Sequence, residues 1–192
     1  STRKESSAAS DVYKRQFSSI DYPETAMFRD RRLIQFLQRP AEYTHAVFST
    51  ALDPNVFVLR LVPGMRADII PMLEGRYRAL VLESFGVGGL PGGDDGAMFA
   101  AVRDWCGAGH LAVFTTQVPH EGSDLAVYEV GRAAKALPGV LEAHDMTPEA
   151  TAVKLMWVLG QTTDRAEAEK LFLTPVQWLS LIHISEATRH LR

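Results

Sequence analysis

Residues 79–96 read ALVLESFGVGGLPGGDDG. The apolar run 79–82 has the length of a buried strand. It ends in the polar pair Glu83 and Ser84, and a loop with six of the chain's fourteen glycines follows. In parallel sheets covered by helices, such loops leave the carboxyl ends of the strands, where ligand crevices form. The stretch therefore predicts a buried strand that delivers a flexible loop to a functional edge.

The glycine spacing argues against a dinucleotide fingerprint. Pro91 stands where the third glycine of G-x-G-x-x-G would fall, and no helix is expected to begin directly after it. Gly86 and Gly88 are better explained as turn residues, because glycine tolerates positive φ. We expect a shaped turn here and not a nucleotide site.

The rest of the pattern alternates between strands and helices. Strands are expected at 56–62, 79–82, 111–114 and 140–141. Helices are expected at 67–74, 95–107 and 126–137. A further helix is expected to begin after a cap at Asp145 or Thr147, and the last one covers 165–172 with Asp164 as its cap. This order predicts an α/β fold: a small doubly wound (Rossmann-like) parallel sheet of about four strands with flanking helices.

The composition is that of a globular protein. Hydrophobic residues make up 46% of the chain and charged residues 22%, and the formal net charge is −3. Because the two ends are basic, the middle of the chain carries most of the negative charge, which disfavours a nucleic-acid partner. No apolar run is long enough to cross a bilayer, so no membrane association is expected. The single cysteine, Cys106, favours a reducing, cytoplasmic setting and is expected to be a packed core residue.

The two ends of the chain do not resemble protein structure. SSAASDVYKRQ at 6–16 and SLIHISEATRH at 180–190 resemble translated adapter sequence found at the ends of assembled sequencing fragments. Genuine flexible termini are the alternative. Four segments are therefore expected: an artefactual disordered tail at 1–16, the remnant of an N-terminal domain plus a linker at 17–54, an α/β domain at 55–177, and an artefactual tail at 178–192.

Polar residues follow three of the predicted strands and meet at one edge of the sheet. By residue type, Ser84, His120 and Asp145 could form a hydrolase triad. The nucleophile elbow G-x-S-x-G is missing, since Glu83 and Phe85 flank the serine. Capping of helices and strand ends is the simpler role for these polar groups.

Other chemistry has little support in the pattern. The pairs His120–Glu121 and His144–Asp145 lack the regular spacing of a structural zinc site, and there is only one thiol. We expect no metal. Tyr128 and Glu129 follow a loop at the start of a helix, and they face either the crevice or solvent.

Four spaced motifs resemble the C-terminal domain of cytoplasmic, type I bacterial L-asparaginase. They are LRLVPGMRADII at 59–70, ALVLESFGVGGLP at 79–91, LAVFTTQVPHEGSDLAVYEVG at 111–131 and HDMTPEATAVKLMWVLGQ at 144–161. Residues 17–23 resemble the end of the same family's N-terminal domain. The resemblance covers roughly 17–172, and its most specific part is D-M-T-x-E-A-T-x-x-K-L.

The resemblance implies an amidohydrolase that converts L-asparagine to L-aspartate and ammonia through a threonine nucleophile, with no cofactor. In the family this threonine lies in a T-G-G-T motif of the N-terminal domain, which the sequence lacks. Thr162-Thr163-Asp164 has the wrong order for the family's T-D-T motif. The resemblance thus implies no catalytic residue here, a homo-oligomeric intact protein, and an isolated chain that is inactive and tends to associate.

The resemblance also implies which residues border the substrate site of a partner. They are Ser84, Gly86, Gly88, Thr115, Gln117, His120 and Glu129. Allosteric members carry an arginine and a cysteine where this chain has Glu83 and Val118, so allosteric asparagine binding is not expected. Two other classes stay open: a small-ligand-binding regulatory module and a non-catalytic interaction domain.

Overall fold

The structure, a computed structural model, describes residues 10–11, 16–17, 26–29, 32–36, 48–91 and 96–174. The chain divides into two compact units, Ser1–Thr50 and Ala51–Arg192. The tails expected at 1–16 and 178–192 lie almost wholly outside the described residues.

The described part of the first unit consists of short antiparallel strand pairs. Strand β1 (Ser10–Asp11) pairs with β2 (Gln16–Phe17), and β3 (Ala26–Arg29) pairs with β4 (Arg32–Gln35). Leu33 is 65% exposed. The described hairpin therefore buries little apolar surface.

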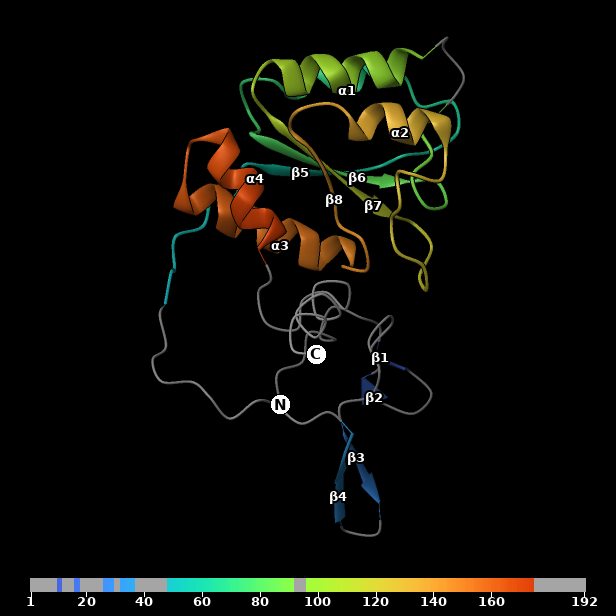
Figure 1. The fold of residues 1–192 in the computed structure, drawn as a ribbon, viewed down its shortest axis with the longest axis vertical. Coiled ribbons are helices and arrows are strands. Elements are labelled where there is room, and N and C mark those ends of the chain that lie inside the picture. The colour runs from blue at the N-terminus through green and yellow to red at the C-terminus, as the bar shows by residue number, and fades with distance from the viewer. Residues whose placement is uncertain are drawn as a thin grey trace, which may run out of the picture. The chain divides into compact units, whose positions relative to one another are not determined.

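The second unit is built on a four-stranded parallel sheet in the order β5-β6-β7-β8 (Figure 1). The strands are β5 (Val56–Arg60), β6 (Ala79–Ser84), β7 (Leu111–Thr116) and β8 (Val140–Glu142). The predicted fold class, an α/β domain around a parallel sheet of about four strands with flanking helices, is confirmed.

Helices cover both faces of this sheet (Figure 1). The connections that cross between consecutive strands pack on one face and include α1 (Ala97–Gly107) and α2 (Glu129–Lys135). The other face is covered by α3 (Pro148–Gln161) and α4 (Arg165–Leu173), which follow the last strand. Within the described residues, no helix is long and apolar enough to cross a membrane.

Alternate residues of β6 supply the two cores. Leu80 and Leu82 pack with α1, whereas Ala79 and Val81 pack with α3, and all four are 0% exposed. A strand buried on both faces has to be apolar at every position, which explains the continuous apolar run. Trp105 of α1 is also fully buried, and its indole N–H donates to the Leu111 carbonyl at 2.9 Å.

The structure corrects the helix expected at 67–74. Two 3₁₀ helices, Ala67–Ile69 and Pro71–Leu73, take its place. Pro71 has no backbone N–H to donate, so a regular α-helix cannot continue through it. Ile70 and Leu73 nevertheless pack into the core, as their spacing predicted.

The helix expected at 126–137 is shorter than predicted and begins at Glu129. The preceding backbone is held in a turn, since Ala126 N–H donates to the Asp124 carboxylate at 2.9 Å. The two expected caps behave differently. Thr147, and not Asp145, caps α3 by accepting from Ala150 N–H at 3.3 Å, and Asp164 caps α4 as predicted.

Candidate functional site

The polar ends of β6 and β7 lie side by side and are tied together. Both strands run two residues past their apolar segments, because Glu83 pairs with Thr115 and Ser84 with Thr116. The Ser84 hydroxyl donates to the Thr115 carbonyl at 2.7 Å, and the Thr116 hydroxyl donates to the Gly86 carbonyl. These hydroxyls fix the beginning of the glycine loop.

Gln117 joins the ends of three strands. Its side-chain amide donates to the Leu61 carbonyl at 2.6 Å and to the Glu83 carbonyl at 2.8 Å. Its backbone N–H donates to the Ser84 carbonyl at 3.2 Å. Gln117 is therefore bound to the protein itself, and its amide builds the edge from within.

The described part of the glycine loop is a hydrogen-bonded turn. Phe85 and Gly89 exchange backbone hydrogen bonds of 3.0 and 2.7 Å. Gly86 has a φ of 51°, which confirms the expected positive φ there. A Cβ at Gly88 would lie 2.9 Å from Cδ2 of Leu125, so the turn packs closely on the segment that leads to α2. The second half of the loop, 92–95, lies outside the described residues.

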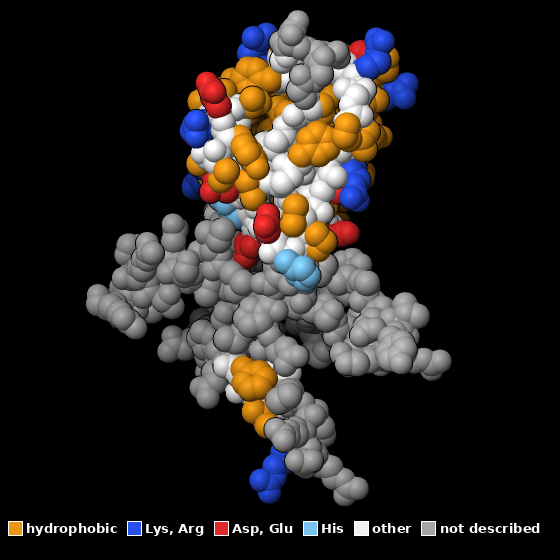
Figure 2. All heavy atoms as spheres, turned by 90° about the vertical axis from the view of Figure 1, so that its right-hand side faces the viewer, with side chains coloured by type: hydrophobic (Ala, Val, Ile, Leu, Met, Phe, Trp, Pro, Cys, Tyr) orange, Lys and Arg blue, Asp and Glu red, His pale blue; other side chains and the backbone are white. Residues whose placement is uncertain are grey.

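The exposed part of this edge comes from the start of α2. Tyr128 is 48% exposed, and its hydroxyl lies 3.5 Å from where a Cβ would stand at Gly86. Glu129, in the first turn of α2, is exposed. Figure 2 shows hydrophobic side chains around a paler strip on this side of the unit. Val127 and Val130, which flank Tyr128 and Glu129 in the chain, are about half exposed. The edge thus offers an aromatic hydroxyl and a carboxylate beside apolar surface.

The structure does not support the triad hypothesis. Ser84 is 0% exposed and its hydroxyl proton is directed at the Thr115 carbonyl. His120 is exposed in the loop after β7, and Asp145 lies in the turn before α3. A nucleophile has to be reachable by substrate, and Ser84 is not. Its role is structural.

Glu142 organises the edge, and the sequence reasoning missed it. Its carboxylate is 6% exposed and accepts from Leu125 N–H at 2.9 Å and from Lys135 at 3.2 Å. His144 Nδ1 lies 3.6 Å from the same carboxylate, and His144 has a φ of 53°. An acidic residue at the end of an apolar strand was the available signal.

Ser123 joins the same region to the sheet. Its backbone N–H donates to the His144 carbonyl at 2.8 Å, and its hydroxyl oxygen accepts from the His144 N–H at 2.8 Å. The same hydroxyl donates to the Phe114 carbonyl at 3.1 Å. The loop before α2 is therefore fixed to the ends of β7 and β8. Together with the glycine turn it forms one continuous wall.

Two further titratable groups are buried in helices. Cys106 lies near the end of α1 and Lys154 in the middle of α3. Burial raises the pKa of Cys106 to about 12 and lowers the pKa of Lys154 to about 8. Among the described residues, no group of three His, Cys, Asp or Glu side chains comes together in a way that could hold a metal ion.

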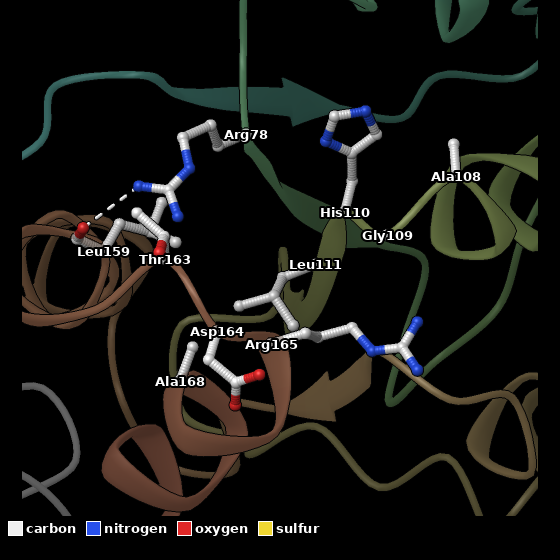
Figure 3. Close-up of a pocket in the computed structure, with 10 residues that line it drawn as sticks. All are labelled: Arg78, Ala108, Gly109, His110, Leu111, Leu159, Thr163, Asp164, Arg165 and Ala168. Atoms are coloured by element: carbon white, nitrogen blue, oxygen red, sulfur yellow. Dashed lines mark hydrogen bonds between the residues drawn. The ribbon is translucent and has the colours of Figure 1, made fainter.

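A cavity of about 200 Å³ lies at the opposite end of the strands (Figure 3). The titratable residues of its lining are Arg78, His110, Asp164 and Arg165. Both arginines already have protein partners: Arg78 pairs with Asp53 at 2.8 Å and Arg165 with Glu169 at 3.4 Å. This cavity is separate from the predicted edge.

Comparison with protein families matches residues 55–172 to the glutaminase/asparaginase C-terminal domain. The chain belongs to this family. It is 38% identical over 156 residues to an L-asparaginase of Thermococcus kodakarensis, which covers 81% of the chain and 46% of that protein. It is also 32% identical over 164 residues to one subunit of the glutamyl-tRNA(Gln) amidotransferase of Metallosphaera sedula, over 82% of the chain and 36% of that protein.

Solved structures agree with the family assignment. The thermostable L-asparaginase from Thermococcus kodakarensis superposes with a TM-score of 0.76 at 35% identity, covering 83% of this chain and 48% of that one. L-asparaginase I from Vibrio cholerae shares the fold with a TM-score of 0.69 at 24% identity, over 85% and 49% of the two chains. The chain therefore spans about half the length, or less, of the relatives it matches.

Proposed function

We propose that this chain is the C-terminal, subunit-packing half of an L-asparaginase, and that it borders a substrate site completed by another domain. The observation that carries the proposal is the family match over 55–172, together with 38% identity to a protein named L-asparaginase. The reaction is hydrolysis of L-asparagine to L-aspartate and ammonia. In the proposal the threonine nucleophile belongs to an N-terminal domain.

The wall at the carboxyl ends of the strands is the part that meets substrate. Five residues shape this wall: Ser84, Gly86, Gly88, Thr115 and Gln117. Ser84, Thr115 and Gln117 do so through hydrogen bonds within the wall. In the proposal, the residues that contact the substrate directly are the exposed ones of the edge, Tyr128, Glu129 and His120. The carboxylate of Glu129 suits the α-ammonium group of asparagine by charge.

The proposal takes no residue of the described wall as the attacking group, and it assigns chemistry and positioning to different domains. Acyl transfer needs an activated hydroxyl and a base within hydrogen-bond reach. The one serine at the centre of the wall is buried and bonded to a carbonyl. We accordingly expect no turnover by the chain alone.

The intact protein is proposed to be a cytoplasmic homo-oligomer that binds L-asparagine and needs no cofactor. Support for oligomerisation comes from the exposed apolar side chains beside the wall, since apolar surface of this kind is typical of subunit contacts. The single buried cysteine supports a reducing compartment.

The test is a complementation assay. Ammonia release from L-asparagine is measured for the chain alone and after mixing with the separately produced N-terminal part of the Thermococcus kodakarensis L-asparaginase. We expect no release from the chain alone, release from the mixture, and a higher KM for the mixture that contains Glu129→Gln. Turnover by the chain alone that survives removal of host asparaginase would overturn the proposal.

A second candidate is a component of an amidotransferase, favoured by the similarity to the Metallosphaera sedula glutamyl-tRNA(Gln) amidotransferase. The same assay distinguishes the two, with the N-terminal part of that amidotransferase relative in place of the asparaginase part. Activity in this arm alone would favour the amidotransferase. Tight binding of asparagine, aspartate or a nucleotide to the chain by calorimetry would instead favour a regulatory module, and co-elution with a candidate partner would favour an interaction domain.

A further inference from the structure

The segment 51–55, which leads into the family domain, is bound to the end of helix α3. Asp53 N–H donates to the Met156 carbonyl at 2.9 Å, and the Gln161 side chain donates to the Ala51 carbonyl at 2.8 Å. The segment then continues into β5. Residues 51–55 are named the entry segment below.

Gly160 makes room for the entry segment. A Cβ at this position would lie 2.6 Å from the Ala51 carbonyl carbon and 2.8 Å from the Leu52 nitrogen, and both of these are backbone atoms that cannot swing away. Glycine is unfavourable within a helix, so its presence in the last turn of α3 calls for a packing reason. The close approach of the entry segment is that reason.

Arg78 fastens the same junction from the side of the sheet. Its guanidinium donates to the Asp53 carboxylate at 2.8 Å, to the Leu159 carbonyl at 3.0 Å and to the Thr162 carbonyl at 3.2 Å. Figure 3 shows the guanidinium directed at the end of α3, with the bond to Leu159 dashed. One side chain therefore joins the entry segment, the last turn of α3 and the residue before β6.

Helix α3 runs from the proposed site to this junction. Its first turn follows Met146, whose carbonyl accepts from the Thr115 hydroxyl at 3.5 Å at the wall. Its last turn holds the entry segment. The helix has 14 residues and is therefore about 21 Å long. A rigid element of this kind fixes the distance between the wall and the point where the chain enters.

We propose that Gly160, Gln161 and Arg78 form a docking site for the entry segment, which acts as a fixed strut that sets how a preceding domain is attached to this one. The docking itself is independent of the proposed function. Its purpose, to hold a preceding domain where the assembled oligomer can bring its nucleophile to the wall of a partner subunit, rests on that function. Without the docking site, the attachment would be a flexible tether.

The test compares Gly160→Ala with the matched control Gly107→Ala in the 192-residue chain. Both glycines lie in the last turns of helices, and a Cβ at Gly107 meets nothing within 4 Å. Amide hydrogen exchange is followed at Asp53 and in strands β6 and β7. We expect Gly160→Ala to speed exchange at Asp53 by about tenfold or more while the strands stay protected, and Gly107→Ala to speed exchange at neither place.

A second measurement tests whether the chain leads into the entry segment from one fixed direction. Spin labels at Thr50→Cys and Glu74→Cys report one distance, and the buried Cys106, whose pKa is raised, does not take up label. A narrow distance distribution that broadens in Gly160→Ala supports the strut. If Gly160→Ala fails to fold, Gln161→Ala, which removes the bond to Ala51, takes its place.

Two results would overturn the proposal. One is unchanged Asp53 exchange together with an unchanged distance distribution when the docking site is altered. The other is an equal effect of Gly107→Ala. Neither measurement depends on ammonia release, so a failed complementation assay leaves the docking site standing, and a failed docking test leaves the asparaginase proposal standing.

Discussion

The buried carboxylate of Glu142 accepts the backbone N–H of Leu125 at 2.9 Å, although the two residues are 17 positions apart. The bond joins the end of β8 to the segment that packs on the glycine turn. Leu125 is itself 0% exposed and contacts both Gly88 and Gly131. This acid–amide contact between elements distant in sequence is therefore one of the bonds that hold the wall at this edge.

Replacing Glu142 should loosen the wall. In Glu142→Ala the buried Leu125 N–H loses its acceptor, and we expect the free energy of unfolding to fall by about 2–3 kcal/mol. Glu142→Gln keeps an acceptor oxygen and loses the carboxylate charge that faces His144 and the half-exposed Lys135, so a loss of about 1 kcal/mol or less is expected. Urea unfolding of the two variants checks this. Equal losses would show that the acceptor is not what matters.

Gly131 should not tolerate a methyl group. A Cβ there would collide with the Leu125 carbonyl group, whose carbon lies 3.1 Å away. Alanine favours the helical state by about 1 kcal/mol, but we expect the clash to exceed this gain and Gly131→Ala to destabilise the chain by about 1–3 kcal/mol. Gly107→Ala, which enters open space, should stabilise it. Thermal unfolding of both variants decides, and a rise in Tm for Gly131→Ala would contradict the prediction.

The sheet was predictable because its central strands are buried on both faces. Residues 79–82 and 111–114 are apolar at every position, which few structures other than a covered parallel strand require. The helix at 67–74 was wrong because apolar spacing was weighed without the missing N–H of Pro71. Periodicity gave the buried face there and not the type of helix.

The polar ends of β6 and β7 lie together, as their places after neighbouring parallel strands led us to expect, but the bonds that build this edge were not predictable. Thr115 and Ser84 were expected to stand near each other, and the structure shows their bond. The role of Glu142 depends on the Leu125 amide, which reaches it only through the fold. A long-range contact of this kind leaves no spacing pattern in the sequence.

The thiol of Cys106 should be inert in the folded chain. Burial raises its pKa to about 12, so almost none of it is thiolate at pH 8, and the side chain is 1% exposed. We expect an aromatic disulfide reagent at pH 8 to leave the folded chain unlabelled and to label it with one equivalent in denaturant. Rapid labelling without denaturant would show that the α1 face opens readily.

The free energy of unfolding should carry a pH-dependent contribution from Lys154. Burial lowers its pKa from 10.5 to about 8, and the ammonium contacts only the Thr174 carbonyl, at 3.1 Å, and the Phe172 ring among the partners resolved for it. Below pH 8 both states hold the proton. Between pH 8 and 10.5 the unfolded chain keeps a proton that the folded chain has lost, so this contribution rises with pH.

Lys154→Met should remove this rise. Relative to the variant, the unaltered chain is expected to gain about 2 kcal/mol in free energy of unfolding between pH 7 and pH 10. Urea unfolding at the two pH values measures it, with Lys170→Met as the control, because the Lys170 side chain is 74% exposed. The same pH dependence in Lys154→Met and in the unaltered chain would mean that the buried amine is solvated, since only desolvation separates its pKa in the folded chain from that in the unfolded chain.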